Sequence, residues 1–157
     1  MKMFLWKIHP FGTMYAMNQP TEIPPGFSRH TRSSGLTEPW EPIYAAFGDD
    51  SFSLGLAAAQ AHVNSRGFVH GGLLSALADN AMGLSCAYKL GGRTALVTVS
   101  LSVDYLGSGQ LGNWIEVRAQ PRQTGKTLCF ADASLYADGR LCATARAVFK
   151  IAAPIPS

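Results

Sequence analysis

The stretch His70-Gly71-Gly72-Leu73-Leu74-Ser75-Ala76-Leu77-Ala78-Asp79 decides the fold, because the longest predicted helix of the chain begins inside it. From Leu73 to about Leu90 the residues are mostly good helix formers or small, whereas two adjacent glycines are costly inside a helix. This pattern predicts a helix that begins near Gly71. The first N–H groups of a helix lack partners within it, so this end can bind an anion or a developing oxyanion.

The predicted helix also carries one acidic residue, Asp79, eight residues after Gly71. A rise of 1.5 Å per residue separates the two by roughly 12 Å along the axis, so no single reacting carbon can touch both. A site that uses the Gly71 amide and the Asp79 carboxylate together needs two antiparallel copies of the helix. The spacing therefore predicts a twofold homodimer with two composite sites, and it leaves further pairing into a tetramer open.

The run from Asn64 to Asp79, Asn-Ser-Arg-Gly-Phe-Val-His-Gly-Gly followed by Ala-Leu-Ala-Asp, resembles the signature of hotdog-fold thioesterases of the phenylacetate-degradation (PaaI) type. The resemblance covers roughly residues 45 to 151. It implies an acyl-CoA thioesterase that hydrolyses an aromatic or medium-chain acyl-CoA to the free acid and CoA. Coenzyme A is then part of the substrate, and no cofactor is expected.

The same resemblance implies roles for individual residues. The residue matching Asp79 is the nucleophile or general base, and the N–H matching Gly71 polarises the thioester carbonyl. Asn64 matches a residue that orients the substrate or the attacking water, and Thr98 matches a hydroxyl residue that assists from the next strand. We interpret His70, beside the helix start, as a positioning residue, because the helix dipole disfavours its protonated form.

Outside the signature, the pattern of apolar residues predicts an α+β fold: an antiparallel sheet of about five to six strands wrapped around one long central helix. We expect a short helix over 39–47 and strands over 52–59, 95–104, 114–120, 127–136 and 141–151. An Asp138-Gly139 pair predicts the last hairpin. We predict two parts, a flexible N-terminal extension over 1–36 and a hotdog domain over 37–153.

Charge argues against a nucleic-acid partner. The whole chain carries a formal net charge of +3, and the first 36 residues already account for it with Lys2, Lys7, Arg29 and Arg32 against Glu22. The remainder is neutral, whereas phosphate binding needs clustered Lys and Arg on the folded surface. No run of about 18 apolar residues exists, so a membrane-spanning helix is not expected.

The cysteines and histidines argue against a metal site. Cys86, Cys129 and Cys142 are odd in number and lack metal-ligand spacing, so we interpret them as buried small side chains. The absence of a disulfide pattern favours a reducing compartment and a cytoplasmic protein. The histidines at positions 9, 30, 62 and 70 likewise show no ligand pattern.

Several interpretations stay open at this level. Arg93, Arg122 and Lys126 lie in or near predicted turns, where they fit either contacts with the phosphates of CoA or solvated charges. Asn64 equally fits a turn cap, and Thr98 equally fits an ordinary strand position. A hotdog hydratase or dehydratase, and an acyl-CoA-binding protein without turnover, remain as alternative functions. Four aromatic residues, Trp40, Tyr44, Phe47 and Phe68, fit either an acyl pocket or the core.

Overall fold

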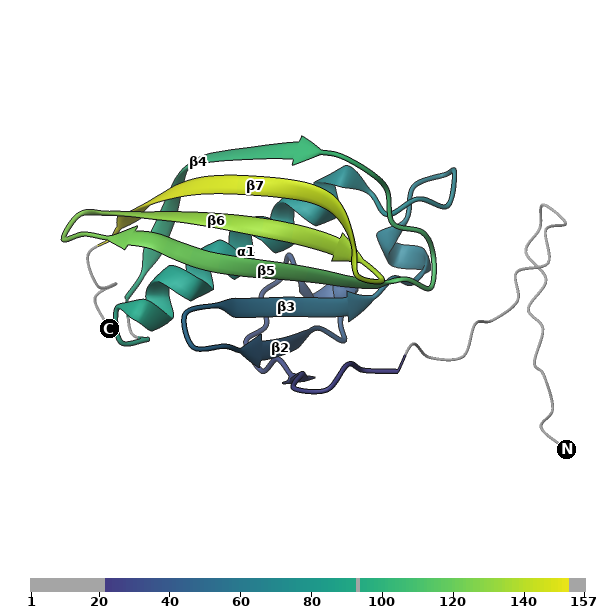
Figure 1. Cartoon of the computed structure of the whole chain (residues 1–157), viewed down its shortest axis with the longest axis horizontal. Helices are drawn as coiled ribbons and strands as arrows, with labels where there is room; N and C mark the ends of the chain where they lie inside the picture. The colour runs from purple at the N-terminus through teal and green to yellow at the C-terminus, as the bar shows by residue number, and fades with distance from the viewer. Residues whose placement is uncertain (1–21, 93, 153–157) are drawn as a thin grey trace, which may run out of the picture.

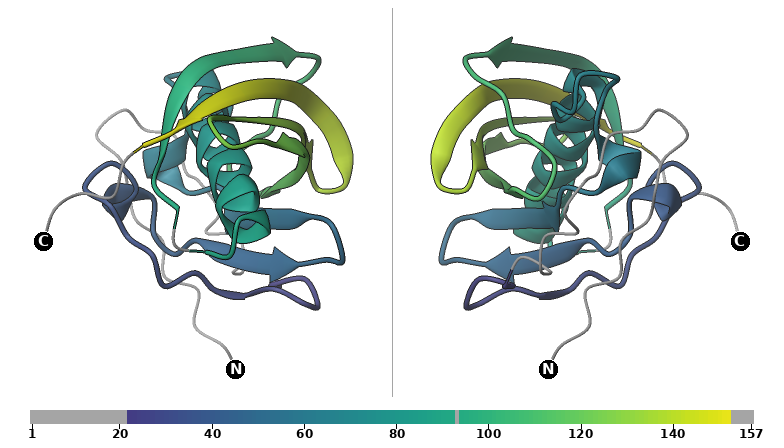
Figure 2. Two further views of the ribbon diagram at one scale, coloured as in Figure 1. Left: turned by 90° about the vertical axis from the view of Figure 1, so that its left-hand side faces the viewer. Right: turned by 90° about the vertical axis from the view of Figure 1, so that its right-hand side faces the viewer.

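The computed structural model describes residues 22–92 and 94–152 of the chain. A seven-stranded antiparallel sheet curves around one long helix, and Figures 1 and 2 show the helix lying along its concave side. The strand order is β1-β2-β3-β5-β6-β7-β4. The elements are β1 (Ser28–Arg29), η1 (Glu38–Trp40), β2 (Tyr44–Phe47), β3 (Phe52–Ala57), η2 (Gln60–His62), α1 (Gly71–Lys89), β4 (Leu96–Tyr105), β5 (Trp114–Thr124), β6 (Leu128–Ala137) and β7 (Arg140–Ile151). This is the hotdog arrangement that the resemblance implied.

The helix α1 matches its predicted bounds, because both ends carry local signals. His70 is extended (ψ 132°) and its Nδ1 accepts a hydrogen bond from the Gly72 N–H, which caps the first turn. At the other end Gly91 and Gly92 adopt positive φ (91° and 84°), a conformation that ends helices and that glycine adopts without steric cost.

The core lies between α1 and the sheet. Small residues let the helix approach the strands closely, because Ala78 and Ala81 are fully buried and leave room for Leu77 and Met82 beside them. The three cysteines at positions 86, 129 and 142 are buried and unpaired, which confirms their interpretation as small core side chains. Burial in apolar surroundings raises the pKa of the Cys86 thiol to about 11.

The prediction of a helix over 39–47 is wrong. Residues Glu38–Trp40 form a single 3-10 turn, and Tyr44–Phe47 form strand β2, which pairs with β3. Two prolines, Pro39 and Pro42, cannot donate backbone hydrogen bonds, and the pairing with β3 outweighs the helix preference of the residues that follow. The strand predicted over 52–59 ends at Ala57, before the 3-10 turn η2.

Two strands that were not predicted from the sequence, β1 and β2, extend the sheet at one edge. Strand β1 pairs with β2, and the His30 N–H continues this contact to the Ile43 carbonyl at 2.9 Å. Residues 22–36, which composition assigned to a loose extension, therefore run along the domain. Residues 1–21 of that predicted extension lie outside the described residues. Among the described residues no helix is both long and apolar enough to span a membrane.

Strand β4 forms the opposite edge of the sheet and contains a β-bulge. Within residues 22–92 and 94–152 it pairs only with β7. The register shifts between Thr98 and Ser100, so that Val99 is an extra residue opposite β7. The predicted alternation of residues along this strand is interrupted at that point. The Asp138-Gly139 hairpin between β6 and β7 is confirmed, with positive φ at both residues (47° and 76°).

Candidate active site

The carboxylate of Asp79 is held by a strand hydroxyl. Asp79 lies half-buried in the middle of α1, and the Thr98 hydroxyl on β4 donates a hydrogen bond of 2.8 Å to its Oδ1. A helix residue and a strand residue, nineteen positions apart in sequence, therefore meet at this point. The bond orients Oδ1 and leaves Oδ2 available for a further contact.

The first turn of α1 presents an unused backbone donor. The Gly71 N–H has no hydrogen-bond acceptor within residues 22–92 and 94–152, whereas the next N–H, that of Gly72, is taken by His70 Nδ1 at 2.9 Å. The loop that leads into the helix is held by two backbone bonds of 2.9 Å, from the Val69 N–H to Gly109 and from the His70 N–H to His62. A fixed, unpaired N–H at a helix N-terminus suits an oxyanion.

His62 anchors this loop from inside the domain. Its side chain is buried, and its Nδ1 accepts a hydrogen bond of 2.8 Å from the Ala59 N–H. Burial lowers the pKa of His62, and hydrogen bonds with the backbone of Trp40 and Ala57 oppose that effect. Because the His62 carbonyl accepts from the His70 N–H, this core histidine sets the position of the helix cap.

Asn64 caps a turn, one of the two interpretations that the sequence left open. Its Oδ1 accepts hydrogen bonds from the backbone N–H groups of Arg66 at 2.9 Å and Phe68 at 3.2 Å. These bonds use only the oxygen, so the amide nitrogen can still donate to a ligand. The Asn64 N–H donates to the Phe68 carbonyl at 2.8 Å, and the His70 N–H donates to the His62 carbonyl, so this turn lies beside the start of α1.

A residue that the sequence did not single out also contacts the helix start. The Tyr105 hydroxyl, at the end of β4, donates to the Gly71 carbonyl at 2.8 Å and lies 2.6 Å from Ser75 Oγ. Strict alternation along a strand would place Tyr105 and Thr98 on opposite faces, so the sequence offered no signal for this contact.

A cavity of about 370 Å³ opens beside the Asp79–Thr98 pair. One side is apolar and comes from the helix and sheet, with Leu54, Leu77 and Phe149 among its residues. The other side comes from the segment before η1 and is polar. Its residues are His30, Arg32, Ser33, Ser34 and Thr37. Such a volume and mixed lining are typical of small-molecule sites.

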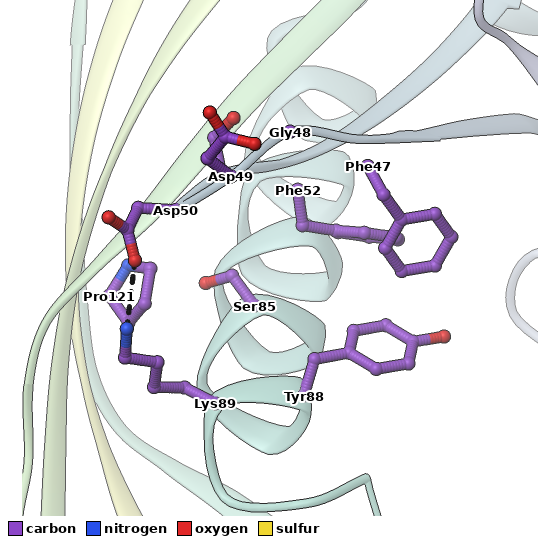
Figure 3. Close-up of a pocket in the computed structure, with 10 residues that line it drawn as sticks. Phe47, Gly48, Asp49, Asp50, Phe52, Ser85, Tyr88, Lys89 and Pro121 are labelled. Carbon is purple, nitrogen blue, oxygen red and sulfur yellow. Dashed lines mark hydrogen bonds and ion pairs between the residues drawn. The ribbon is translucent and has the colours of Figure 1, made fainter.

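A second, smaller pocket lies at the far end of the helix, with a volume of about 170 Å³. Figure 3 shows the rings of Phe47, Phe52 and Tyr88 on one side and the ion pair between Lys89 and Asp50 on the other. Among the four aromatic residues considered for an acyl pocket, Phe47 alone lines this smaller pocket. The larger cavity is lined by none of those four.

Two of the basic residues considered for CoA phosphates, Arg122 and Lys126, do not line the cavity. The Arg122 guanidinium donates to Asp132 Oδ2 at 2.7 Å, so it is already paired, and Lys126 is exposed in the turn after β5. Arg93 lies outside the described residues. Within the described ranges no group of three potential metal ligands occurs.

Comparison with known proteins agrees with the fold. The model of the thioesterase superfamily matches residues 66–144. A Pseudomonas aeruginosa protein with a provisional esterase name is 34% identical over 130 residues, which cover 82% of this chain and 97% of that protein. Human acyl-coenzyme A thioesterase 13 is 35% identical over 89 residues, 54% of this chain and 61% of that protein.

Two solved structures share the fold at lower identity. Zebrafish thioesterase superfamily member 2 has a TM-score of 0.70 at 24% identity, and the match covers 76% of this chain and 88% of that one. The E. coli PaaI protein from the phenylacetic acid degradation operon has a TM-score of 0.64 at 22% identity, with 71% and 80% covered. The family model and the Pseudomonas relative together show that this chain belongs to the thioesterase superfamily, as a hotdog-fold thioester hydrolase.

Proposed function

We propose that the protein hydrolyses the thioester of an acyl-CoA to a free acid and CoA, in a site shared by two protomers. The observation that carries the proposal is that one helix carries both a carboxylate beside a cavity and a backbone N–H without an acceptor. The Asp79 carboxylate accepts a hydrogen bond from Thr98 and lines the cavity, and the N–H of Gly71 lacks an acceptor among the described residues. The name of the human relative, an acyl-coenzyme A thioesterase, supports CoA as the leaving group.

A homodimer is proposed because Gly71 and Asp79 lie roughly 12 Å apart along the axis of α1. The partner's helix, antiparallel to the first, would bring its Gly71 N–H near this Asp79. The edge strand β4 supports such an interface, since its outer edge is unpaired in the described structure. Large apolar side chains are exposed along and just after it: Val97, Val99, Leu101, Tyr105 and Leu106.

In the proposed mechanism the thioester carbonyl oxygen accepts a hydrogen bond from the Gly71 N–H of one protomer, where the helix dipole stabilises the developing negative charge. Asp79 of the other protomer either takes a proton from water as the water attacks the carbonyl carbon, or attacks that carbon itself. In the first route the C–S bond then breaks, and water supplies the second oxygen of the acid. In the second route the C–S bond breaks as Asp79 forms a mixed anhydride with the acyl group, and water then cleaves this anhydride to give the free acid and the Asp79 carboxylate. CoA leaves as the thiolate in both routes. Thr98 holds Asp79 in place, and the Asn64 amide orients the carbonyl or the water.

The acyl group is proposed to lie in the cavity beside Asp79. Its apolar side suits an aromatic ring or a medium-length aliphatic chain, the two kinds of acyl group that the resemblance implies. The CoA moiety would extend outside the cavity. Lys126 remains a candidate for its phosphates, whereas the pairing of Arg122 with Asp132 makes Arg122 a weaker one.

Release of CoA from aromatic and aliphatic acyl-CoA esters tests this function. Asp79→Asn keeps the size of the side chain and removes the carboxylate charge, so we expect turnover to fall at least about a hundredfold. Turnover that survives in this variant would overturn the assignment of Asp79. Binding of acyl-CoA without turnover by the unmodified protein would indicate a binding protein instead.

A matched pair tests the Gly71 N–H. Proline is tolerated at the first position of a helix, and the extended His70 (ψ 132°) suits a residue before proline. Gly71→Pro therefore removes the N–H, whereas Gly71→Ala keeps it, and both add a Cβ that lies 3.3 Å from Tyr105. We expect kcat to be about a hundredfold lower in the proline variant than in the alanine variant. Equal rates would exclude the N–H from catalysis.

The geometry disfavours a hydratase that uses His70 as its base. Because Nδ1 of His70 accepts from the Gly72 N–H, the neutral ring carries its proton on Nε2. Neither nitrogen is then free to accept a proton from a substrate. His70 is therefore proposed to hold the first turn of the helix, and hydration of an enoyl-CoA would be the finding against this proposal.

A further inference from the structure

Two hydroxyl groups of β4 reach the helix, one at each half of the proposed site. Thr98 contacts Asp79, and Tyr105 contacts Gly71. The Tyr105 hydroxyl has one proton, which it donates to the Gly71 carbonyl at 2.8 Å, so Ser75 is the donor in the 2.6 Å contact between the two hydroxyls. The side chain of Tyr105 is half exposed, yet its polar end is fully engaged on the first turn of α1.

The β-bulge at Val99 makes this arrangement possible. Thr98 and Tyr105 are seven residues apart, and residues separated by an odd number point to opposite faces of a regular strand. The register shift between Thr98 and Ser100 inserts one extra residue, which reverses the alternation beyond it. Both hydroxyls therefore face α1. Bulges of this kind re-aim side chains beside active sites.

Tyr105 makes one of the two hydrogen bonds that hold the peptide group between Gly71 and Gly72. The peptide between Gly71 and Gly72 donates its N–H to His70 Nδ1 at 2.9 Å and accepts at its C=O from Tyr105 at 2.8 Å. The ring of Tyr105 also packs on Gly71, because a Cβ added there would lie 3.3 Å from the ring. The residue before Gly71 is held as well, because the His70 N–H donates to the His62 carbonyl at 2.9 Å. Gly71 is therefore fixed on both sides, and its own N–H keeps one direction.

We infer that Tyr105 is a positioning residue for catalysis, which aligns the Gly71 N–H through the Gly71 carbonyl. The inference rests on the proposed thioesterase function. It assigns β4 a double role, because one strand orients the carboxylate half of one site and the N–H half of the other. The bulge makes both roles possible, since without it either Thr98 or Tyr105 would face away from the helix.

Tyr105→Phe tests the inference, because it keeps the ring and removes only the hydroxyl. We expect kcat for CoA release to fall about tenfold, equally for every acyl group, with KM within about twofold of the unmodified protein. Ser75→Ala should lower kcat less, and the double variant should match Tyr105→Phe, since both changes act through one hydroxyl. Tyr88→Phe, at the far end of the same helix, is the control and should leave kcat unchanged.

Melting temperature and sedimentation are measured on the same samples, and rates are expressed per folded dimer. A fall in kcat with unchanged melting temperature and mass supports positioning. An unchanged kcat in Tyr105→Phe, or a fall that disappears once rates are corrected for unfolded protein, would overturn it. Failure of the proposed function is separate, because the unmodified protein would then release no CoA.

Discussion

The two edges of the sheet are built differently. Strand β1 at one edge has two residues, both exposed, and Arg29 within it forms an ion pair with Glu41 at 3.0 Å. Strand β4 at the other edge has ten residues, a bulge and a row of exposed apolar side chains. Short, charged edges resist pairing with another chain, whereas long apolar edges favour it.

This difference indicates which edge of the sheet supplies residues to the proposed active site and the proposed dimer interface. The segment that follows β1 forms one wall of the cavity, and that wall is polar. The β4 edge supplies Thr98 and Tyr105 to the helix and remains unpaired on its outer side in the described structure. We therefore expect substitutions on β4 to affect activity and assembly, and substitutions on β1 to affect neither strongly.

The largest effect is expected from a charge on the apolar edge. Val99→Lys places an ammonium group at a position that is 60% exposed in one chain and is proposed to be covered in the dimer. Sedimentation should show a mass halved to that of the monomer, and CoA release should fall more than about a hundredfold because the sites are composite. Ser28→Lys adds the same charge to the β1 edge and should change neither. Equal losses of dimer and of activity in the two variants would contradict the proposal that the β4 edge forms the interface and the β1 edge does not.

A smaller effect is expected from Thr98→Val, which retains the shape of the side chain and removes its hydroxyl. Asp79 then loses the hydrogen bond of 2.8 Å that orients its carboxylate. We expect kcat to fall about tenfold, with little change in melting temperature. Ser102→Ala, on the same strand, serves as the control, and a loss of the same size there would show that the strand as a whole was disturbed.

Stability should depend on pH through the buried histidine below the cap. Burial lowers the pKa of His62 from its ordinary value of 6.5, so below that pH the unfolded chain takes up a proton before the folded protein does. The melting temperature should therefore fall as the pH is lowered from about 7.5 to 5.5. His62→Gln should flatten this dependence without abolishing it, because burial also lowers the pKa of His30. If the melting temperature of His62→Gln depended on pH as that of the unmodified protein does, the assignment of this dependence to His62 would be wrong.

The smallest effect is expected from Arg29→Ala on the β1 edge. Its ion pair with Glu41 is partly exposed, and such pairs contribute roughly 0–1 kcal/mol to the free energy of unfolding. Denaturant titration should detect a change no larger than this, and CoA release should remain unchanged. A larger loss would mean that this edge contributes more to the fold than its burial indicates.

Local chemistry explains which parts of this structure were predictable. The helix start at Gly71 depends on glycine and helix propensity, and most strands follow from alternation, so both could be derived from neighbouring residues. Strand β2 could not, because its pairing with β3 overrides local preference. Tyr105 was missed because a one-residue bulge, which alternation does not reveal, turns it toward the helix. The polar wall of the cavity depends on tertiary contacts of a segment whose composition suggests a loose chain.

The most direct test of the central claim mixes two inactive proteins. Asp79→Asn lacks the carboxylate half of the site and Gly71→Pro lacks the N–H half, so a mixed dimer contains one intact composite site. After subunit exchange at equal concentrations, we expect about one quarter of the activity of the unmodified protein, because half of the dimers are mixed. Activity that stays at the level of the two separate variants would show that the site does not combine Gly71 and Asp79 from different protomers.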